Sequence, residues 1–301
     1  MAANPGEEAA SASSLETVAQ EEQPAQHAKP ATPPLVMKLR TLRDKGVQNM
    51  ESHTILAPED WTVEGGAWWA PQAYFNILPS REIVARSPEG VFLRIAPGLT
   101  ANDYKPSASA RQMGIQRAQV GASDNGYPVV YYPKTKSAWK KWILKDVLPA
   151  DFPNAKKIRI KKVEEVVELK EGLEQMMAPM FQMLEQNNQQ SAAMGMPMRQ
   201  YGKVLSYGFE GTYEEDGQEF EFVLVLACIV NGMEMEMGEQ VSWTVEPCFT
   251  LGAPKGQLEE NAPLLMAIFG SVRETPKWAK MKVDHIAAMN RIAAKGAADR
   301  A

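Results

Sequence analysis

The chain has 301 residues, of which 45% are hydrophobic, 8% aromatic and 23% charged, and its formal net charge is -5 at pH 7. This composition is typical of a soluble globular protein that buries a sizeable core. Three histidines and two cysteines exclude a disulfide scaffold and a multi-cysteine zinc module. The acidic balance argues against a polyanion binder, and no apolar stretch reaches the ~18 residues that span a bilayer.

The first 35 residues differ in composition from the rest. Alanine, proline, glutamate, serine and glutamine dominate residues 1–34, which end in Pro30-Ala31-Thr32-Pro33-Pro34. Such a segment buries too little apolar surface to offset its ordering entropy, which predicts a disordered tail or linker over 1–35. Exported bacterial proteins and lipoproteins often carry this composition just after their cleavage site. We therefore expect a periplasmic or cell-envelope protein whose leader has been removed, with lipid anchoring as an option and a cytoplasmic protein as the alternative.

The first half of the folded part is predicted to contain mainly strands. The expected elements are a short helix or turn over 37–45, strands over 53–56, 67–78, 82–86 and 91–95, a loop-rich stretch over 97–135 and a helix over 137–147. Ser87-Pro88-Glu89-Gly90 has proline second and glycine fourth, as in a type I turn. Trp139, Ile143 and Val147 recur every four residues, which is the helical spacing.

The second half alternates helices with strands. A strand over 157–167 precedes a helix over 169–187, whose apolar stripe is Leu169, Leu173, Met176, Met180 and Leu184, and a polar loop over 188–197. Strands over 203–213, 218–230 and 241–251 form a meander, and two helices follow. The last helix carries the stripe Trp278, Met281, His285, Met289 and Ile292. Sequential hairpins with interspersed helices predict an α+β fold, an antiparallel β-sheet with helices packed on it.

Three short motifs occur together in this order. Pro58-Glu59-Asp60-Trp61 follows an opening strand, the Ser87–Gly90 turn forms a hairpin, and a late amphipathic helix ends in Ala267-Ile268-Phe269-Gly270-Ser271-Val272-Arg273. This arrangement resembles the PsbP-like fold group, including DcrB-like domains of exported bacterial proteins and lipoproteins. Thr275-Pro276-Lys277-Trp278 is also similar to a group of exported bacterial proteins without assigned activity. The resemblance covers residues 50–295; it implies a PsbP-like α/β/α sandwich and no catalytic residues.

Catalytic signatures are missing from the sequence. It has no G-x-S-x-G elbow, phosphate-cradling glycine loop, H-E-x-x-H or acidic calcium loop. His27 lies in the tail, His53 begins a strand, and His285 lies on an apolar stripe, where packing is the ordinary role. Cys228 and Cys248 fall on neighbouring strands, and both a disulfide, which needs Cα atoms within about 7 Å, and two buried thiols stay open. We expect no enzyme and no resident cofactor, with a hydrolase of unrecognised site as the third alternative.

Positive charge is concentrated between Lys134 and Lys162, a stretch with ten basic and only two acidic residues. The residues that suit an anionic surface are Lys136, Trp139, Lys140, Lys141, Lys145, Lys157, Arg159 and Lys161. Lysines beside tryptophans on a helix match an anionic membrane surface, a polyanion or an acidic partner. The simpler interpretation is a solvated helix face followed by a lysine-protected edge strand. Because the chain as a whole is acidic, we expect no nucleic-acid partner.

Methionine is abundant, with 17 residues, and two triplets share one spacing. The triplets are Met194, Met196 and Met198, and Met233, Met235 and Met237. Alternate side chains of extended backbone share a face, so three thioethers of a triplet would converge. Such a soft ligand set selects Cu(I). The alternative is apolar contact, because methionine is a flexible filler of hydrophobic surfaces.

These observations predict a single α+β domain over 36–295, with a helical, Met-rich insert around 168–200 and a C-terminal fray over 296–301. The expected function is that of a non-enzymatic exported or envelope-associated domain that binds an unknown protein or small ligand. Cu(I) handling through the two methionine triplets is the alternative.

Overall fold

The computed structural model describes residues 35–68, 80–124, 126–196 and 198–298. The predicted tail over 1–34, residues 69–79 of one predicted strand and residues 299–301 lie outside the described residues. Residues Val36–Ala301 group into one compact unit, to which the following description refers.

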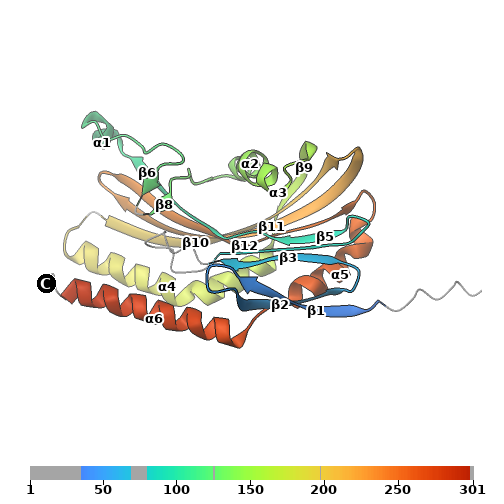
Figure 1. Ribbon diagram of the computed structural model, residues 1–301. Coiled ribbons are helices and arrows are strands. Elements are labelled where there is room, and N and C mark those ends of the chain that lie inside the picture. The colour runs from blue at the N-terminus through green and yellow to red at the C-terminus, as the bar shows by residue number, and fades with distance from the viewer. Residues whose placement is uncertain (1–34, 69–79, 125, 197, 299–301) are drawn as a thin grey trace, which may run out of the picture. The chain divides into compact units, whose positions relative to one another are not determined.

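The described residues form a large sheet with helices on both of its faces (Figure 1). The strands are β1 (Met37–Asp44), β2 (Met50–Pro58), β3 (Thr62–Trp68), β4 (Ser80–Arg86), β5 (Phe92–Ile95), β6 (Leu99–Pro106), β7 (Ser123–Asp124), β8 (Tyr127–Pro128), β9 (Lys156–Glu165), β10 (Met198–Glu215), β11 (Gln218–Met235), β12 (Gly238–Pro254) and β13 (Arg273–Glu274). The helices are α1 (Ala108–Gln112), α2 (Lys136–Trp142), the π-helical turn η1 (Ile143–Val147), α3 (Leu148–Asp151), α4 (Val167–Ala193), α5 (Leu258–Gly270) and α6 (Pro276–Ala298).

The strand order is β13-β2-β1-β3-β4-β5-β12-β11-β10-β9, with β6 also paired to β12. Neighbouring strands are antiparallel except for the short parallel pairing of β1 with β3. β12 is long enough to hold two partners on one edge, β6 along its first half and β5 along its second. The predicted α+β class, an antiparallel sheet with helices packed on it, is confirmed.

The three longest strands, β10, β11 and β12, form a continuous meander. The turn between β10 and β11 places Asp216 and Gly217 at positive φ, 50° and 81°, as a tight hairpin requires. Gly232 lies inside β11 opposite Tyr201, and a Cβ at Gly232 would be 2.0 Å from the Tyr201 ring. The glycine therefore lets the ring lie across the neighbouring strand, and β11 continues through Asn231 and Gly232 beyond the predicted end of this strand at residue 230.

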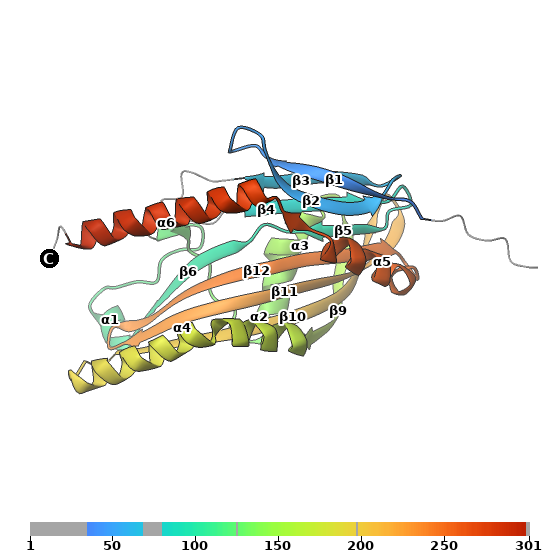
Figure 2. The same ribbon diagram turned by 90° about the horizontal axis from the view of Figure 1, so that it is seen from below.

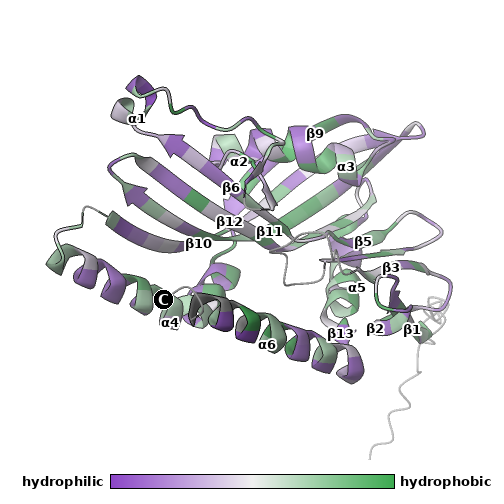
Figure 3. Cartoon of the chain, turned by 60° about the vertical axis from the view of Figure 1, so that its left-hand side comes forward, coloured by the Kyte–Doolittle hydropathy of each residue, from purple (hydrophilic) through white to green (hydrophobic). Residues whose placement is uncertain are grey.

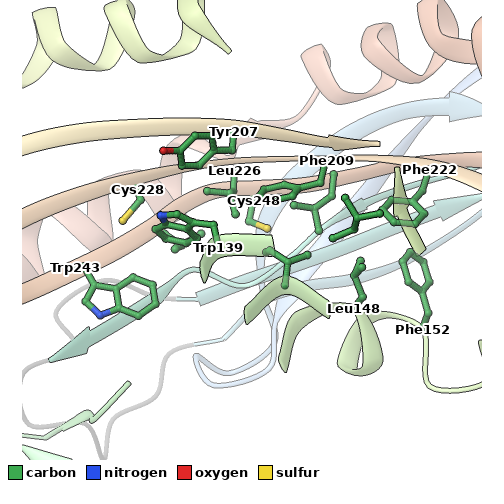
Figure 4. Packing of buried hydrophobic residues seen from close by; sticks show 14 of the residues in the cluster. Trp139, Leu148, Phe152, Tyr207, Phe209, Phe222, Leu226, Cys228, Trp243 and Cys248 are labelled. Carbon is green, nitrogen blue, oxygen red and sulfur yellow. The ribbon is translucent and has the colours of Figure 1, made fainter. Parts of the chain in front are cut away.

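Each face of the sheet has its own hydrophobic core. On one face, α2, η1 and α3 cover β9–β12, and Trp139, Leu148 and Phe152 pack against Phe209 and Phe222 of the strands (Figure 4). On the other face, α5 packs on β1–β5 and β12 through residues that include Leu265 and Ile268. Two strand-region tryptophans contribute to these cores, Trp243 to the first cluster and Trp61 to the second.

Helices α4, α5 and α6 lie on the face opposite α2 and α3 (Figures 1 and 2). α4 approaches β10 closely because Gly202 leaves room for the Phe181 ring, which a Cβ at Gly202 would meet at 2.3 Å. Asn188 fixes the same helix to β10: its amide accepts from Gln200 N at 2.6 Å and donates to Gln200 O at 2.8 Å. Within the part of the chain described, no helix combines the length and apolar character of a membrane span.

Several predicted boundaries are wrong, each for a local reason. Residues Met37–Asp44 form a strand rather than a helix or turn, because they pair with β2 along their whole length. α4 continues to Ala193 and includes most of the predicted polar loop, because Asn188 finds its polar partner on β10. β6 lies in the stretch predicted to be loop-rich, where its pairing to β12 outweighs local turn residues.

The apolar stripes of the two long helices also differ from prediction. Met176 is 62% exposed and Ile292 65% exposed, so neither packs on the sheet. His285 is exposed as well. Polar and apolar residues mix along both α4 and α6 (Figure 3). The assigned bounds of α6 reach Ala298, and the fray over 296–301 stays a prediction.

Candidate functional site

A cavity of about 620 Å³ lies between the sheet and the α2–η1–α3 segment. Its wall is mostly apolar and comes from β5, β12, the chain around 96–99, the loop before α2 and the helical segment. The lining residues are Arg94, Ala96, Pro97, Leu99, Val120, Val130, Tyr131, Tyr132, Pro133, Ala138, Lys141, Trp142, Lys145, Asp146, Val147, Ala150, Asp151, Val245 and Cys248. A cavity of this size and character matches sites for small organic molecules.

The helical side of the cavity is fixed by an aromatic cluster. Trp139 is completely buried, with its ring centroid 5.7 Å from Trp243 and 5.5 Å from Trp142. Trp243 in turn donates its indole N–H to Val130 O at 3.1 Å. Thr135 caps α2 by accepting from Ala138 N at 3.2 Å. Sheet, loop and helix are thus held together around the cavity.

The loop that completes the wall is fixed by an ion pair between a buried carboxylate and a partly exposed arginine. Asp103 of β6 is 3% exposed and accepts from Arg117 Nε at 2.8 Å and from Tyr132 N at 3.0 Å. The Arg117 guanidinium also lies over the Tyr131 ring, 3.6 Å from its centroid. Val120 and Tyr131 of this segment belong to the cavity wall. Removing either charge of the ion pair would therefore free the segment from β6 and loosen this part of the wall.

Charge is built into the base of the cavity. Arg94 of β5 forms an ion pair with Asp151 of α3 and donates to Glu82 of β4 at 2.6 Å. The Asp151 side chain is only 5% exposed, and its Oδ2 has no hydrogen-bond partner among the described residues. Burial raises the pKa of Asp151 to about 6 against the opposing effect of Arg94. A buried polar atom without a partner is uncommon in folded proteins, so this oxygen is a natural contact for a ligand.

The two cysteines are free and buried. Cys248 lines the cavity, and Cys228 lies beside Trp139 of the aromatic cluster (Figure 4). Burial raises the pKa of each thiol to about 12, so both are protonated and unreactive at neutral pH. Of the two alternatives open at the level of sequence, the structure has the pair of buried thiols.

The residues proposed for an anionic surface divide into three groups. Trp139 is completely buried and cannot contact a surface, because the first turn of α2 presents its ring to the sheet. Lys136, Lys140, Lys141 and Lys145 lie on the α2–η1 segment, where Lys141 and Lys145 also line the cavity. Lys157, Arg159 and Lys161 are exposed on β9, the last strand of the sheet order, and Lys157 pairs with Glu214 at 2.8 Å. A lysine-bearing edge strand fits the simpler interpretation.

The methionine triplets are only partly in extended backbone. Met198, Met233 and Met235 are in strands, and Met198 is directly opposite Met235 in the β10–β11 register. Met194 caps the end of α4 and Met196 follows it, both exposed, while Met237 lies in the turn after β11. The described residues include no group of three or more His, Cys, Asp or Glu side chains arranged to hold a metal ion.

The sequence does not predict that polar residues meet at the base of the cavity. Asp151 stands out there only as one of two acidic residues within a basic stretch, and Arg94 as an ordinary strand residue. They meet because β5 and α3 are brought together by β12 and the α2–α3 cover, which no local pattern encodes. His53 is a second residue missed: it lies inside β2, completely buried against Trp278 of α6 at 5.0 Å between ring centroids.

No family model matches the chain, and no curated protein matches its sequence. Comparison with solved structures finds cyanobacterial PsbP (CyanoP) from Synechocystis, at 9% sequence identity and a TM-score of 0.24. The match covers 83% of this chain and 99% of that one.

Proposed function

We propose that this protein is a non-enzymatic binding protein whose cavity takes a small, largely apolar molecule. The observation that carries this proposal is the cavity of about 620 Å³ between the sheet and α2–α3, which has apolar walls and a few polar groups. Cavities of roughly 300–1,000 Å³ with this distribution of groups are the usual form of small-molecule sites. The aromatic cluster and the Asp103–Arg117 pair support the proposal because they hold the walls in place before a ligand binds.

A fluorescent apolar probe tests the proposal. N-phenyl-1-naphthylamine is uncharged at neutral pH and brightens in apolar surroundings, and we expect saturable binding at one site per chain. Ala150 lines the cavity and is exposed, so Ala150→Trp fills part of the cavity with little cost to folding. Ala192→Trp, at an exposed position on α4, is the matched control. Equal probe binding by both variants would place the probe elsewhere and contradict the proposal.

A second candidate function is Cu(I) binding at the sheet face that also carries α4. It is favoured by one observation: Met198 and Met235 are cross-strand partners, with Met233 two residues away on the same strand and face. Thioether ligands favour Cu(I) over Zn(II). Anaerobic titration against a Cu(I) chelator, with Zn(II) in parallel, tests this candidate. Met198→Leu combined with Met235→Leu is expected to remove binding, whereas the exposed pair Met176→Leu and Met183→Leu is not. Wild-type protein that leaves all Cu(I) with a micromolar chelator would exclude it.

We also propose that the protein acts in the periplasm or cell envelope and that it is related to DcrB-like domains. The Ala- and Pro-rich composition of the first 34 residues supports this location. The exposed lysines of α2 and η1 support weak, salt-sensitive contact with anionic membranes. Co-sedimentation with anionic vesicles at low and physiological salt checks the second point. Binding that persists at physiological salt would show a specific lipid site instead.

A further inference from the structure

We infer that the cavity selects ligands that carry an amine or similar cationic hydrogen-bond donor, which Asp151 binds at the base. The inference rests on the proposed binding function and names the chemical class of the ligand. It starts from the geometry: Asp151 lines the cavity, its side chain is 5% exposed, and Oδ2 is buried without a hydrogen-bond partner among the described residues. Leaving a carboxylate oxygen unpaired costs free energy, which a ligand that donates to it recovers.

The charge balance at the base favours a cation. Arg94 is shared between two carboxylates, Asp151 and Glu82, so the three groups together carry one net negative charge when both acids are ionised. The Arg94 side chain is 13% exposed, and its Nε and Nη2 are both directed to Glu82. Its Nη1 forms the ion pair with Asp151 but, like Asp151 Oδ2, has no hydrogen-bond partner among the described residues. A ligand carboxylate would therefore bring a third negative charge to one guanidinium that already neutralises part of two carboxylates. A ligand ammonium would neutralise the group.

The cavity mouth differs in charge from its base. Lys141, Lys145 and Asp146 line the cavity, and all three are exposed to solvent. Water and salt screen exposed charges strongly, whereas buried charges interact through a medium of lower polarity. The base therefore dominates the selection of charge. Apolar wall residues such as Val245 and Leu99 then accommodate the hydrocarbon part of the ligand.

Binding of an amine should also depend on pH. Two charged groups on the neighbouring strands act on Asp151: Arg94 on β5 lowers its pKa and Glu82 on β4 raises it. The neighbouring Cys248 thiol on β12 stays protonated, because burial and the Asp151 charge raise its pKa. Burial raises the pKa of Asp151 to about 6, so the carboxyl is largely protonated at pH 5 and ionised at pH 8. Alkylamines stay protonated throughout this range. Amine affinity should therefore rise from pH 5 to pH 8, and alcohol affinity should not.

Isothermal titration calorimetry with n-decylamine, n-decanol and n-decanoate on the full chain tests the inference directly. At pH 8 we expect decylamine to bind about tenfold or more tightly than decanol, the range of a hydrogen bond to a charged group, and decanoate to bind least. Asp151→Asn should bring decylamine to the level of decanol and abolish the pH dependence. Asp146→Asn removes a carboxylate from the mouth and should retain the preference.

The possible outcomes separate the two proposals. If the naphthylamine probe binds in the cavity but decylamine has no advantage over decanol, the amine inference fails and the binding function stands. If neither the probe nor any decyl compound binds, the binding function fails as well. Should Asp151→Asn disturb folding, the pH dependence of decylamine against decanol in the wild-type protein decides alone. If the ratio of decylamine affinity to decanol affinity is the same at pH 5 and pH 8, the proposed role of Asp151 is wrong.

Discussion

Acidification from pH 7 to pH 5 is expected to weaken the folded state through His53. This side chain is completely buried between β2 and α6, and neither ring nitrogen has a hydrogen-bond partner among the described residues. The pKa of His53 is lowered from 6.5 to about 4. Burial is the largest cause, followed by the positive charge of Arg81. The folded protein thus holds His53 neutral over a range in which the unfolded chain binds a proton.

The sign and size of the effect follow from this difference. Because the folded-state pKa of His53 is lowered, its contribution to stability is complete above the unfolded pKa and is lost as the pH falls towards 4. With pKa values of 6.5 unfolded and about 4 folded, the free energy of unfolding drops by about 2 kcal/mol between pH 7 and pH 5. The ring centroids of His53 and Trp278 are 5.0 Å apart, so protonation of His53 weakens the contact between β2 and α6.

Urea unfolding of wild type and His53→Phe at pH 7 and pH 5 measures this contribution. Phenylalanine loses no hydrogen bond at this site and keeps a ring against Trp278, so stability at pH 7 should stay within ~1.5 kcal/mol of wild type. The variant should lack the drop of about 2 kcal/mol, since all other titrating groups are common to both proteins. His285→Gln, at an exposed position on α6, should keep the wild-type drop. An identical pH dependence in wild type and His53→Phe would refute the reasoning.

Three further predictions concern packing. Gly202→Ala should lower the free energy of unfolding by ~1–3 kcal/mol, because a Cβ there would overlap an aromatic ring of α4; Gly172→Ala, with open space around it, should raise it by up to about 1 kcal/mol. Urea midpoints of the two variants check both signs. Trp243→Ala should cost ~3–5 kcal/mol, and an unchanged melting temperature would show that this indole is not part of the core. Cys228 and Cys248 should resist a thiol reagent at pH 8 in the native protein and react together on denaturation, whereas rapid native labelling would show an open core.

The fold class follows from the sequence because its strongest signals are local. The alternation along β11, the Asp216-Gly217 turn and the Ser87–Gly90 hairpin each specify an antiparallel pair without knowledge of the rest of the chain. β1 escapes prediction because its strand character depends on pairing with β2. Gly232 reads as a turn residue, yet its role is to accommodate the Tyr201 ring across two strands.

The candidate site depends on contacts that no local pattern reports. Arg94 and Asp151 are far apart in the chain and meet only when α3 covers the sheet beside β5. Trp139 shows the opposite error: its place beside lysines suggests a surface residue, but the helix directs its ring into the core. A periodic pattern gives the helix, and only the packing of α2 on the sheet decides which face is buried.

The most direct measurement of the central claim is a crystal structure of the protein soaked with iodobenzene, a small apolar probe with an anomalous signal. We expect an anomalous peak inside the cavity, between Trp142 and Val245, and loss of that peak in Ala150→Trp. Peaks confined to the outer surface, with the cavity empty at saturating probe concentration, would contradict the proposal that this cavity binds an apolar ligand.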